Sequence, residues 1–385
     1  MLMMAETTRP LAAQRHRLLQ IEQLEDRLLL AGNVAISVLS TTLGLTGDAA
    51  ANDISVITEG GQLTLAGNGT TLSPGPGSAA LLPFVVATDF NGTTATFVTL
   101  NNTFVNALAT LPIVTVDFDM QGGNDTVSVE TTTVGGNVVI DMGAGNDLLR
   151  MDQTTVGGDF TANFGDGADR AIATFNTWGD NLGPLEAINV NMGAGNDALA
   201  ISNSSIAQGV QTISTGAGDD IVEYTDCVLY TFDVDLGTGD DQFIMEDTLI
   251  FNPYSPGGGF PHLLGGLGDD AVLLSHNSFD IQSEEDAFTV ELGGGDDELV
   301  MVGNSVDSRK FEFYVDMGAD NDYLATGGNM FFLGPAFSND LPVEFDGGSG
   351  SDLLVALDSQ PLDQFDPDIP FTLLGWELID PDFPA

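Results

Sequence analysis

The chain has 385 residues, of which 57 are acidic and eight are basic, so its formal net charge is −49. Such a surface repels nucleic acid and anionic membranes and attracts cations, which makes a nucleic-acid-binding role unexpected. Because 43% of the residues are hydrophobic and recur periodically, the charge does not indicate disorder, and the chain is long enough for a large core.

Residues 1–33 differ from the rest of the chain. Leucine and isoleucine recur there at helical spacing, and Gly32 ends the pattern, which predicts a short amphipathic helix. The stretch from Leu24 to Ala31 resembles the Leu-Glu-Pro-Arg-x-Leu-Leu segment that opens many large bacterial cell-surface proteins, with Asp26 where that motif has proline. The resemblance implies export or surface display, and an ordinary short helix is the alternative.

Residues 34–118 predict a degenerate β lead-in that caps the fold. Residues 35–38 and 43–46 have strand composition, and Gly60-Gly61 indicates a hairpin turn. The stretch from Asn52 to Val56 is similar to the later turns. Terminal repeats of a solenoid are usually atypical because they cover an open edge.

Residues 119–357 contain ten copies of one phrase, clearest from Asp141 to Asp147 as Asp-Met-Gly-Ala-Gly-Asn-Asp. The copies follow one another at intervals of 21 to 30 residues and end at Asp125, Asp147, Asp169, Asp197, Asp220, Asp241, Asp270, Asp297, Asp322 and Asp352. Apolar residues alternate with polar ones before and after each turn, which predicts strand, tight glycine turn, strand. Repeats at a period of about 20–50 residues indicate a solenoid.

The predicted fold class is therefore all-β: a parallel β-helix, or β-solenoid, of about ten coils with Gly-x-Gly-Asn/Asp-Asp turns. One copy cannot close a core alone, but stacked copies can, because each strand pairs with its equivalents in the coils on either side. A hairpin-rich β-sandwich is the competing fold, since glycine-rich turns at short spacing also suit it.

Three long intervals between copies locate insertions at residues 175–187, 250–261 and 327–342, which carry aromatic residues and prolines. Insertions that leave one corner of a solenoid form a ridge suited to partner binding, although neutral insertions are an equal alternative. Residues 358–385 are proline-rich and predict a C-terminal cap, because proline cannot donate to a further strand ladder. The single cysteine, Cys227, is expected to be a small buried hydrophobe, and no apolar stretch is long enough to span a membrane.

Two copies, beginning at Gly265 and Gly347, match in full the nonapeptide Gly-Gly-x-Gly-x-Asp-x-hydrophobic-x of the RTX, or haemolysin-type, calcium-binding repeat. The resemblance implies that aspartate carboxylates and turn carbonyls bind Ca²⁺. It names as metal ligands Asp270 and Asp352 first, followed by Asp147, Asp197, Asp220, Asp241, Asp297 and Asp322. Family repeats recur every nine residues, whereas here the motif comes once per coil, so an ion would lie between equivalent turns of consecutive coils.

Electrostatics gives an independent reason to expect cations. Coils about 4.8 Å apart would stack the final aspartates into a column. Each neighbouring pair would repel by about 0.9 kcal/mol in water and about 3.5 kcal/mol at an effective dielectric constant of about 20. A second acidic column flanks the first: Asp119, Asp141, Asp235, Glu291, Asp316 and Asp346. Carboxylates and carbonyls without His or Cys suit Ca²⁺. The alternative is that each aspartate caps backbone N–H groups of its own turn.

The sequence favours a secreted or cell-surface calcium-binding solenoid with a structural or adhesive role, not an enzyme. Its expected partners are calcium ions, with cell-surface glycans or matrix proteins as further candidates. The rival is a β-helix carbohydrate-active enzyme or glycan-binding protein that uses the inserted loops, with a polar, aromatic-rimmed cluster around Trp178, Tyr254 and His262. Against an enzyme, there is no nucleophile elbow, phosphate loop or zinc spacing, and the body has few basic residues to hold an acidic glycan.

Overall fold

The structure is a computed structural model of the whole chain. It describes residues 32–39, 41–110, 115–174, 176–178, 187–206, 209–252, 261–281, 286–308, 311–333, 343–356, 364–365, 371–374, 376 and 378–379. The predicted N-terminal helix lies outside these residues, as does Tyr254.

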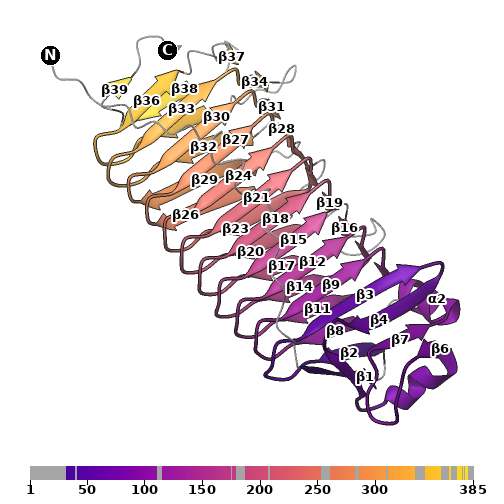
Figure 1. Cartoon of the computed structure of the whole chain (residues 1–385). Helices are drawn as coiled ribbons and strands as arrows, with labels where there is room; N and C mark the ends of the chain where they lie inside the picture. The colour runs from indigo at the N-terminus through magenta and orange to yellow at the C-terminus, as the bar shows by residue number, and fades with distance from the viewer. Residues whose placement is uncertain are drawn as a thin grey trace.

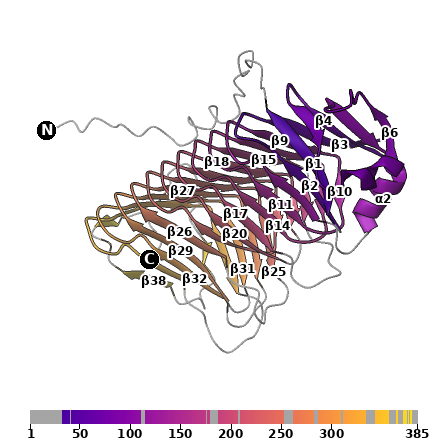
Figure 2. The same ribbon diagram turned by 90° about the horizontal axis from the view of Figure 1, so that it is seen from below.

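The described chain forms a parallel β-solenoid, which confirms the predicted fold class and excludes the sandwich (Figures 1 and 2). Each coil contributes one strand to each of three long sheets, and nearly all neighbouring strands come from consecutive coils and run parallel. A coil runs from sheet A through a glycine turn to sheet B, through a second corner to the short strands of sheet C, and back to sheet A.

Sheet A has 14 strands: β1 (Asn33–Leu39), β2 (Thr42–Thr46), β5 (Thr71–Pro74), β8 (Thr115–Asp119), β11 (Val138–Asp141), β14 (Phe160–Asn163), β17 (Ile188–Asn191), β20 (Val210–Ser214), β23 (Thr231–Asp235), β26 (His262–Leu267), β29 (Asp286–Gly294), β32 (Phe311–Asp316), β35 (Val343–Asp346) and β38 (Phe371–Leu374). Sheet B has 15: β3 (Asp53–Glu59), β4 (Gln62–Gly67), β6 (Val85–Thr88), β7 (Phe97–Leu100), β9 (Thr126–Glu130), β12 (Leu148–Asp152), β15 (Arg170–Thr174), β18 (Ala198–Ser202), β21 (Ile221–Thr225), β24 (Gln242–Glu246), β27 (Ala271–Ser275), β30 (Glu298–Val302), β33 (Tyr323–Gly327), β36 (Leu353–Ala356) and β39 (Leu378–Ile379). Sheet C has ten: β10 (Thr133–Val134), β13 (Thr155–Val156), β16 (Thr177–Trp178), β19 (Ser205–Ile206), β22 (Val228–Leu229), β25 (Leu249–Asn252), β28 (Ser278–Ile281), β31 (Ser305–Ser308), β34 (Met330–Leu333) and β37 (Gln364–Phe365).

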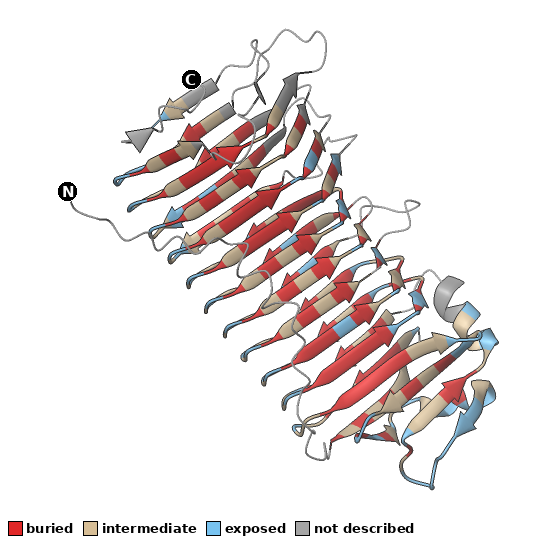
Figure 3. Cartoon of the chain, turned by 45° about the horizontal axis from the view of Figure 1, so that its top comes forward, coloured by how far each residue is buried: buried red, intermediate tan, exposed pale blue. Residues whose placement is uncertain are grey.

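The register between coils follows the sequence repeat. Ile140 pairs with Phe118 in the coil before it and with Ala162 in the coil after it, so equivalent residues stack. Buried and partly exposed residues alternate along most strands (Figure 3), as a period of two requires when one face of a strand points into a core. Aromatic side chains fill the second half of this core. Phe288 stacks on Phe313 with ring centroids 5.0 Å apart.

The N-terminal end of the described chain contains antiparallel strand pairs. Strand β1 pairs antiparallel with β2, and β3 turns at Gly60-Gly61 into β4. The 3-10 helix η2 (Ser78–Phe84) and the helix α2 (Asn102–Thr110) belong to this end. Parallel pairing begins here as well, because β2 pairs with β8 and β3 with β9. The solenoid therefore starts before residue 119, and Asn52 occupies the turn position that is aspartate in later coils.

The three predicted insertions include residues of sheet C, because β16 and β34 lie inside them and β25 overlaps the second. Their described residues are partly structural. Trp178 and Ile250 lie in the core, 3% and 0% exposed. At the other end, β38 pairs with β35 and β39 with β36. The proline-rich C-terminal region thus adds a further coil to the sheets before the described chain ends.

Candidate functional site: a buried aspartate column

The corner between sheets A and B, here called the aspartate corner, consists of the Gly-x-Gly-Asn/Asp-Asp turns. Gly143 and Gly145 have φ angles of 91° and 144°, which residues with a side chain rarely adopt. A Cβ atom on Gly145 would lie only 1.7 Å from the carbonyl oxygen of Gly123 in the preceding coil. These glycines are therefore required both by the backbone conformation and by the close approach of successive coils.

Backbone hydrogen bonds lock the turns together. The residue between the two glycines forms an isolated parallel bridge from coil to coil, as between Ala144, Asp166 and Ala194. The N–H of Gly145 donates to the carbonyl of Asp166 at 2.9 Å, and the N–H of Ala194 donates to the carbonyl of Gly165 at 2.9 Å. Turn carbonyls such as those of Gly165 and Asp166, which belong to the ligand class that the RTX resemblance implies, thus already accept hydrogen bonds between coils.

The final aspartate of each turn points inward. All ten aspartates, from Asp125 to Asp352, are only 0 to 2% exposed. The backbone N–H of Asp125 donates to Oδ1 of Asp147 at 2.7 Å, and the N–H of Asp147 donates to Oδ1 of Asp169 at 2.7 Å. The same bond links every pair of consecutive coils up to Asp352. The series begins with the N–H of Asn52, which donates to Oδ1 of Asp125, and its distances range from 2.6 to 3.1 Å. The carboxyls therefore form one continuous ladder.

This ladder corrects the simpler expectation of capping within one turn. Each aspartate does cap a backbone N–H, but that N–H belongs to the equivalent aspartate of the preceding coil. The eight residues predicted as metal ligands do stack in one column, and Asp125 and Asp169 belong to it as well.

The second carboxyl oxygen is the unusual feature of the column. In the nine aspartates from Asp125 to Asp322, Oδ2 is buried and has no hydrogen-bond partner among the described residues. An ionised carboxylate in that position is costly. Burial accordingly raises the pKa of all nine carboxyls, and the hydrogen bond from the backbone N–H only partly opposes this rise. The pKa rises to about 8 for Asp241 and Asp297, to about 7 for Asp147, Asp197 and Asp322, and to about 6 for Asp125, Asp169 and Asp270. The pKa of Asp220 is raised as well.

A second ladder runs along the outside of the same corner, one residue earlier in each turn. The N–H of Asp240 donates to Oδ1 of Asp219 at 3.2 Å, and the N–H of Asp269 donates to Oδ1 of Asp240 at 3.1 Å. Here each coil donates to the coil before it, opposite to the buried ladder. Four successive members are exposed carboxylates: Asp219, Asp240, Asp269 and Asp296. Five of the six flanking acids that the sequence also singled out end strands of sheet A, and Glu291 lies inside β29. Neutral residues such as Asn163 and Ser214 interrupt this row.

A neutral counterpart occupies the corner between sheets B and C, here called the neutral corner. Its buried column consists of Thr132, Thr154, Asn176, Ser204, Cys227, Thr248, Asn277, Asn304 and Asn329. The N–H of Asn277 donates to Oδ1 of Asn304 at 2.9 Å, while Nδ2 of Asn277 donates to the carbonyl of Met245 at 2.8 Å. Cys227 is 2% exposed, as expected, and takes its place in this column.

The sequence did not predict this second column, because its residue type changes from coil to coil. A constant spacing could have revealed the column, because each of its residues lies two positions after the end of a sheet B strand. The residue between them has a positive φ angle, as at Gln153 (50°) and Asp247 (49°).

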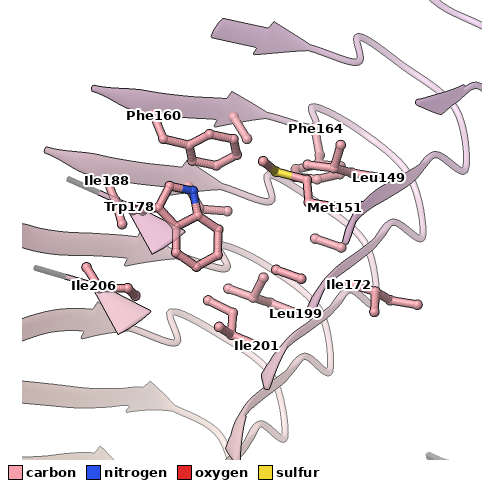
Figure 4. A pocket seen from close by; sticks show the side chains of 14 residues that line it. Leu149, Met151, Phe160, Phe164, Ile172, Trp178, Ile188, Leu199, Ile201 and Ile206 are labelled. Carbon is pink, nitrogen blue, oxygen red and sulfur yellow. The ribbon is translucent and has the colours of Figure 1, made fainter. Parts of the chain in front are cut away.

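Trp178 and His262, the two described residues of the cluster expected for a carbohydrate-active enzyme, do not lie together in one polar site. Trp178 is packed in the core near Phe160 and Ile206, beside a cavity of about 20 Å³ with apolar walls (Figure 4). His262 lies on the outer face of sheet A, where its Nδ1 is 3.3 Å from a carboxylate oxygen of Asp233. In the described part of the chain, no three His, Cys, Asp or Glu side chains converge to hold a metal ion.

The fold and this corner define a class: a parallel β-solenoid with a buried carboxyl ladder along one edge. Comparisons with protein-family models, with curated proteins and with solved structures found no match. Within the described ranges, no helix has the length and apolar composition needed to cross a membrane.

Proposed function

We propose that the protein is a secreted or cell-surface β-solenoid with a structural or adhesive role, stiffened by Ca²⁺ at its aspartate corner. The structural role is supported by the unbroken stacking of coils from β8 to β36. The two cavities found inside the coil stack measure only about 20 and 10 Å³, too small for an organic ligand. What this body offers is long, regular outer faces, which suit contact with surfaces and matrix polymers.

One observation carries the role of cations: the buried carboxyl column, in which nine aspartates each have an unpartnered Oδ2. Coils stack at about 4.8 Å, so neighbouring ionised carboxylates repel at short range. A proton removes that repulsion below the raised pKa values, and a divalent cation removes it above them. Ca²⁺ is the ion that best suits carboxylate oxygens with loose geometry.

The mechanism is coupled ordering. At alkaline pH without a divalent cation, the aspartate corner loosens because its carboxylates repel. Calcium neutralises the corner, and the free energy of binding adds to the stability of the stacked coils. The exposed carboxylates of Asp219, Asp240, Asp269 and Asp296 provide the nearest route by which a hydrated cation reaches the corner.

Thermal unfolding followed by circular dichroism tests this at pH 8, with excess chelator, with millimolar Ca²⁺ and with Mg²⁺ as the control. We expect Ca²⁺ to raise the midpoint more than Mg²⁺ does. Asp297→Asn should remove part of that rise, because it keeps the Oδ1 acceptor while it deletes the charge. An unchanged midpoint with Ca²⁺ would contradict the cation role.

The neighbouring variant Asp296→Asn is the matched control, since it removes a charge from the exposed ladder only. Loss of the Ca²⁺ effect in Asp296→Asn but not in Asp297→Asn would place the ion at the outer ladder. For surface display, antibody labelling of intact cells that express the full chain should detect the solenoid. Labelling only after lysis would contradict export.

A further inference from the structure

The N-terminal end of the solenoid contains a cavity of about 290 Å³. It lies beside β5 and β6, the outermost strands of sheets A and B at this end, and η2 contributes to its wall. Its lining comes from β1, β5, η2, β6 and β7 and from the loop between β6 and β7. This is more than ten times the volume of either cavity found inside the coil stack.

The cavity is apolar in a strongly acidic molecule. Its buried floor consists of Ile36, Leu72, Leu81 and Ala95, each 4% exposed or less. Its lining also includes Ser73, Ser78 and Thr88, but no charged side chain. Apolar cavities hold water poorly and accept apolar guests. The space is large enough for a short alkyl chain.

The cavity opens to solvent between exposed apolar side chains. Leu82 of η2 is 70% exposed and Phe90 is 46% exposed, and both line the cavity. Large hydrophobic side chains exposed to solvent on both η2 and the loop between β6 and β7 indicate a surface that a ligand covers.

A carboxylate stands at the same rim. Asp89 lies between the lining residues Thr88 and Phe90, and it accepts hydrogen bonds from the N–H and Oγ1 of Thr96 at 2.7 and 2.6 Å. These bonds lower the pKa of Asp89, so the rim stays negative at neutral pH. Together with the net charge of −49, this field disfavours an anionic headgroup.

We propose that this cavity binds the single alkyl chain of an amphiphile whose headgroup is neutral or cationic. The chain enters between Leu82 and Phe90, and the headgroup remains outside, beside Asp89. The site is separate from the aspartate corner and does not depend on the role proposed there.

Isothermal titration calorimetry of the full chain with octyltrimethylammonium, octyl glucoside and octanoate, each below its micelle concentration, tests the proposal. We expect one-to-one binding of the first two and at least fivefold weaker binding of octanoate. No saturable binding of any probe, or equally tight binding of octanoate, would overturn it.

Two adjacent alanines of η2 give a matched pair of variants. Ala79 lines the cavity and Ala80 does not, and both are exposed, so a larger side chain is tolerated at either position. Ala79→Trp should fill the cavity and weaken octyl glucoside binding at least tenfold, whereas Ala80→Trp should leave it unchanged. Equal loss in both variants would contradict binding inside the cavity.

The chain itself supplies a competing occupant, the apolar run from Leu28 to Ala31 that precedes β1. If that run fills the cavity, the double substitution Leu29→Ser and Leu30→Ser will tighten octyl glucoside binding by displacing it. That result would overturn the proposal in favour of an internal contact. Unchanged affinity would support an external ligand.

Discussion

The aspartate corner and the neutral corner solve the same problem with different chemistry. At each corner, a buried side-chain oxygen accepts the backbone N–H of the equivalent residue one coil earlier, at 2.7 Å from Asp125 to Asp147 and at 2.9 Å from Asn277 to Asn304. The asparagines also use their second atom, because Nδ2 donates to a strand carbonyl. The aspartates leave theirs unpartnered as far as Asp322.

Stacking alone does not require aspartate. Asparagine, threonine and serine hold coils together at the neutral corner without charge. The aspartate corner carries an electrostatic cost that a structural role alone does not explain. Its stability should therefore respond to pH and cations, whereas that of the neutral corner should not.

The stability of the protein should depend more strongly on pH than on any single substitution. Burial raises the pKa of nine column carboxyls above the value of 3.8 that applies to a free side chain, so the folded state binds more protons than the unfolded state. Their contribution to stability is fully present below about pH 4 and is lost as pH rises through 6 to 8. Chemical unfolding in chelator at pH 5 and pH 8 should show a much more stable protein at pH 5. Greater stability at pH 8 would contradict buried, unpartnered carboxyls.

Among single substitutions, a methyl group added to a glycine of the aspartate corner should lower the free energy of unfolding most. A Cβ on Gly195 would meet the carbonyl oxygen of Gly167 at 1.5 Å, so Gly195→Ala should cost more than about 3 kcal/mol. At the neutral corner, the nearest atom to a Cβ on Gly303 belongs to the ring of His276, at 3.0 Å. Gly303→Ala should cost only about 1 kcal/mol, mainly from its φ angle of 66°. Urea unfolding compares the two, and equal losses would show that coil approach is not tighter at the aspartate corner.

A carboxyl group introduced at the neutral corner should make stability depend on pH there, as it does at the aspartate corner. Nδ2 of Asn304 donates to the carbonyl of Leu274 at 2.8 Å, and Asn304→Asp would turn that donor into a repelling oxygen. We expect a loss of about 2–4 kcal/mol at pH 8 and a smaller loss at pH 5, measured by urea unfolding. A loss independent of pH would mean that the new carboxyl does not titrate in this range.

The reverse substitution should be tolerated. Asp297→Asn keeps the oxygen that accepts the N–H of Asp270 at 2.8 Å and removes a group whose pKa is raised to about 8. We expect a gain of up to about 1 kcal/mol at pH 8 in chelator and no gain at pH 5. Asp297→Ala, which deletes the acceptor, should instead cost about 1–3 kcal/mol at both pH values. Destabilisation by Asp297→Asn at pH 8 would indicate that the charge itself is needed.

The smallest effect concerns backbone strain at the neutral corner. Gln153 has a φ angle of 50°, a conformation that favours glycine, and its exposed side chain bonds only to the half-buried Asp152 among the contacts found. Gln153→Gly should raise the free energy of unfolding by about 0.5–1 kcal/mol, seen as a higher urea midpoint. A lower midpoint would mean that the unfolded chain gains more entropy from glycine than the strain costs.

Much of the fold follows from the sequence because a repeat must stack in register with itself. The alternation around Val138 and Ile140 predicts the sheet A strand, and the glycines of residues 143–145 predict the corner. The direction of the final aspartate does not follow, since Asn146 and Asp147 are adjacent polar residues at a turn. Only the backbone path shows that one faces water and the other the interior. The apolar cavity was also missed, because its walls come from segments without a repeat.

From β8 to β34, the spacing along the chain is the same in every coil at the corner between sheets A and B and at the corner between sheets B and C, so neighbouring coils are equivalent there. Leu148 and Arg170 occupy the same register position in consecutive coils. Removing residues 148–169 would join Asp147 to Arg170 and give a shorter molecule with every ladder intact. Duplication of the same stretch would lengthen it by about 4.8 Å. Gene duplication can therefore change the length of the solenoid by one coil at a time, and no step requires a new fold.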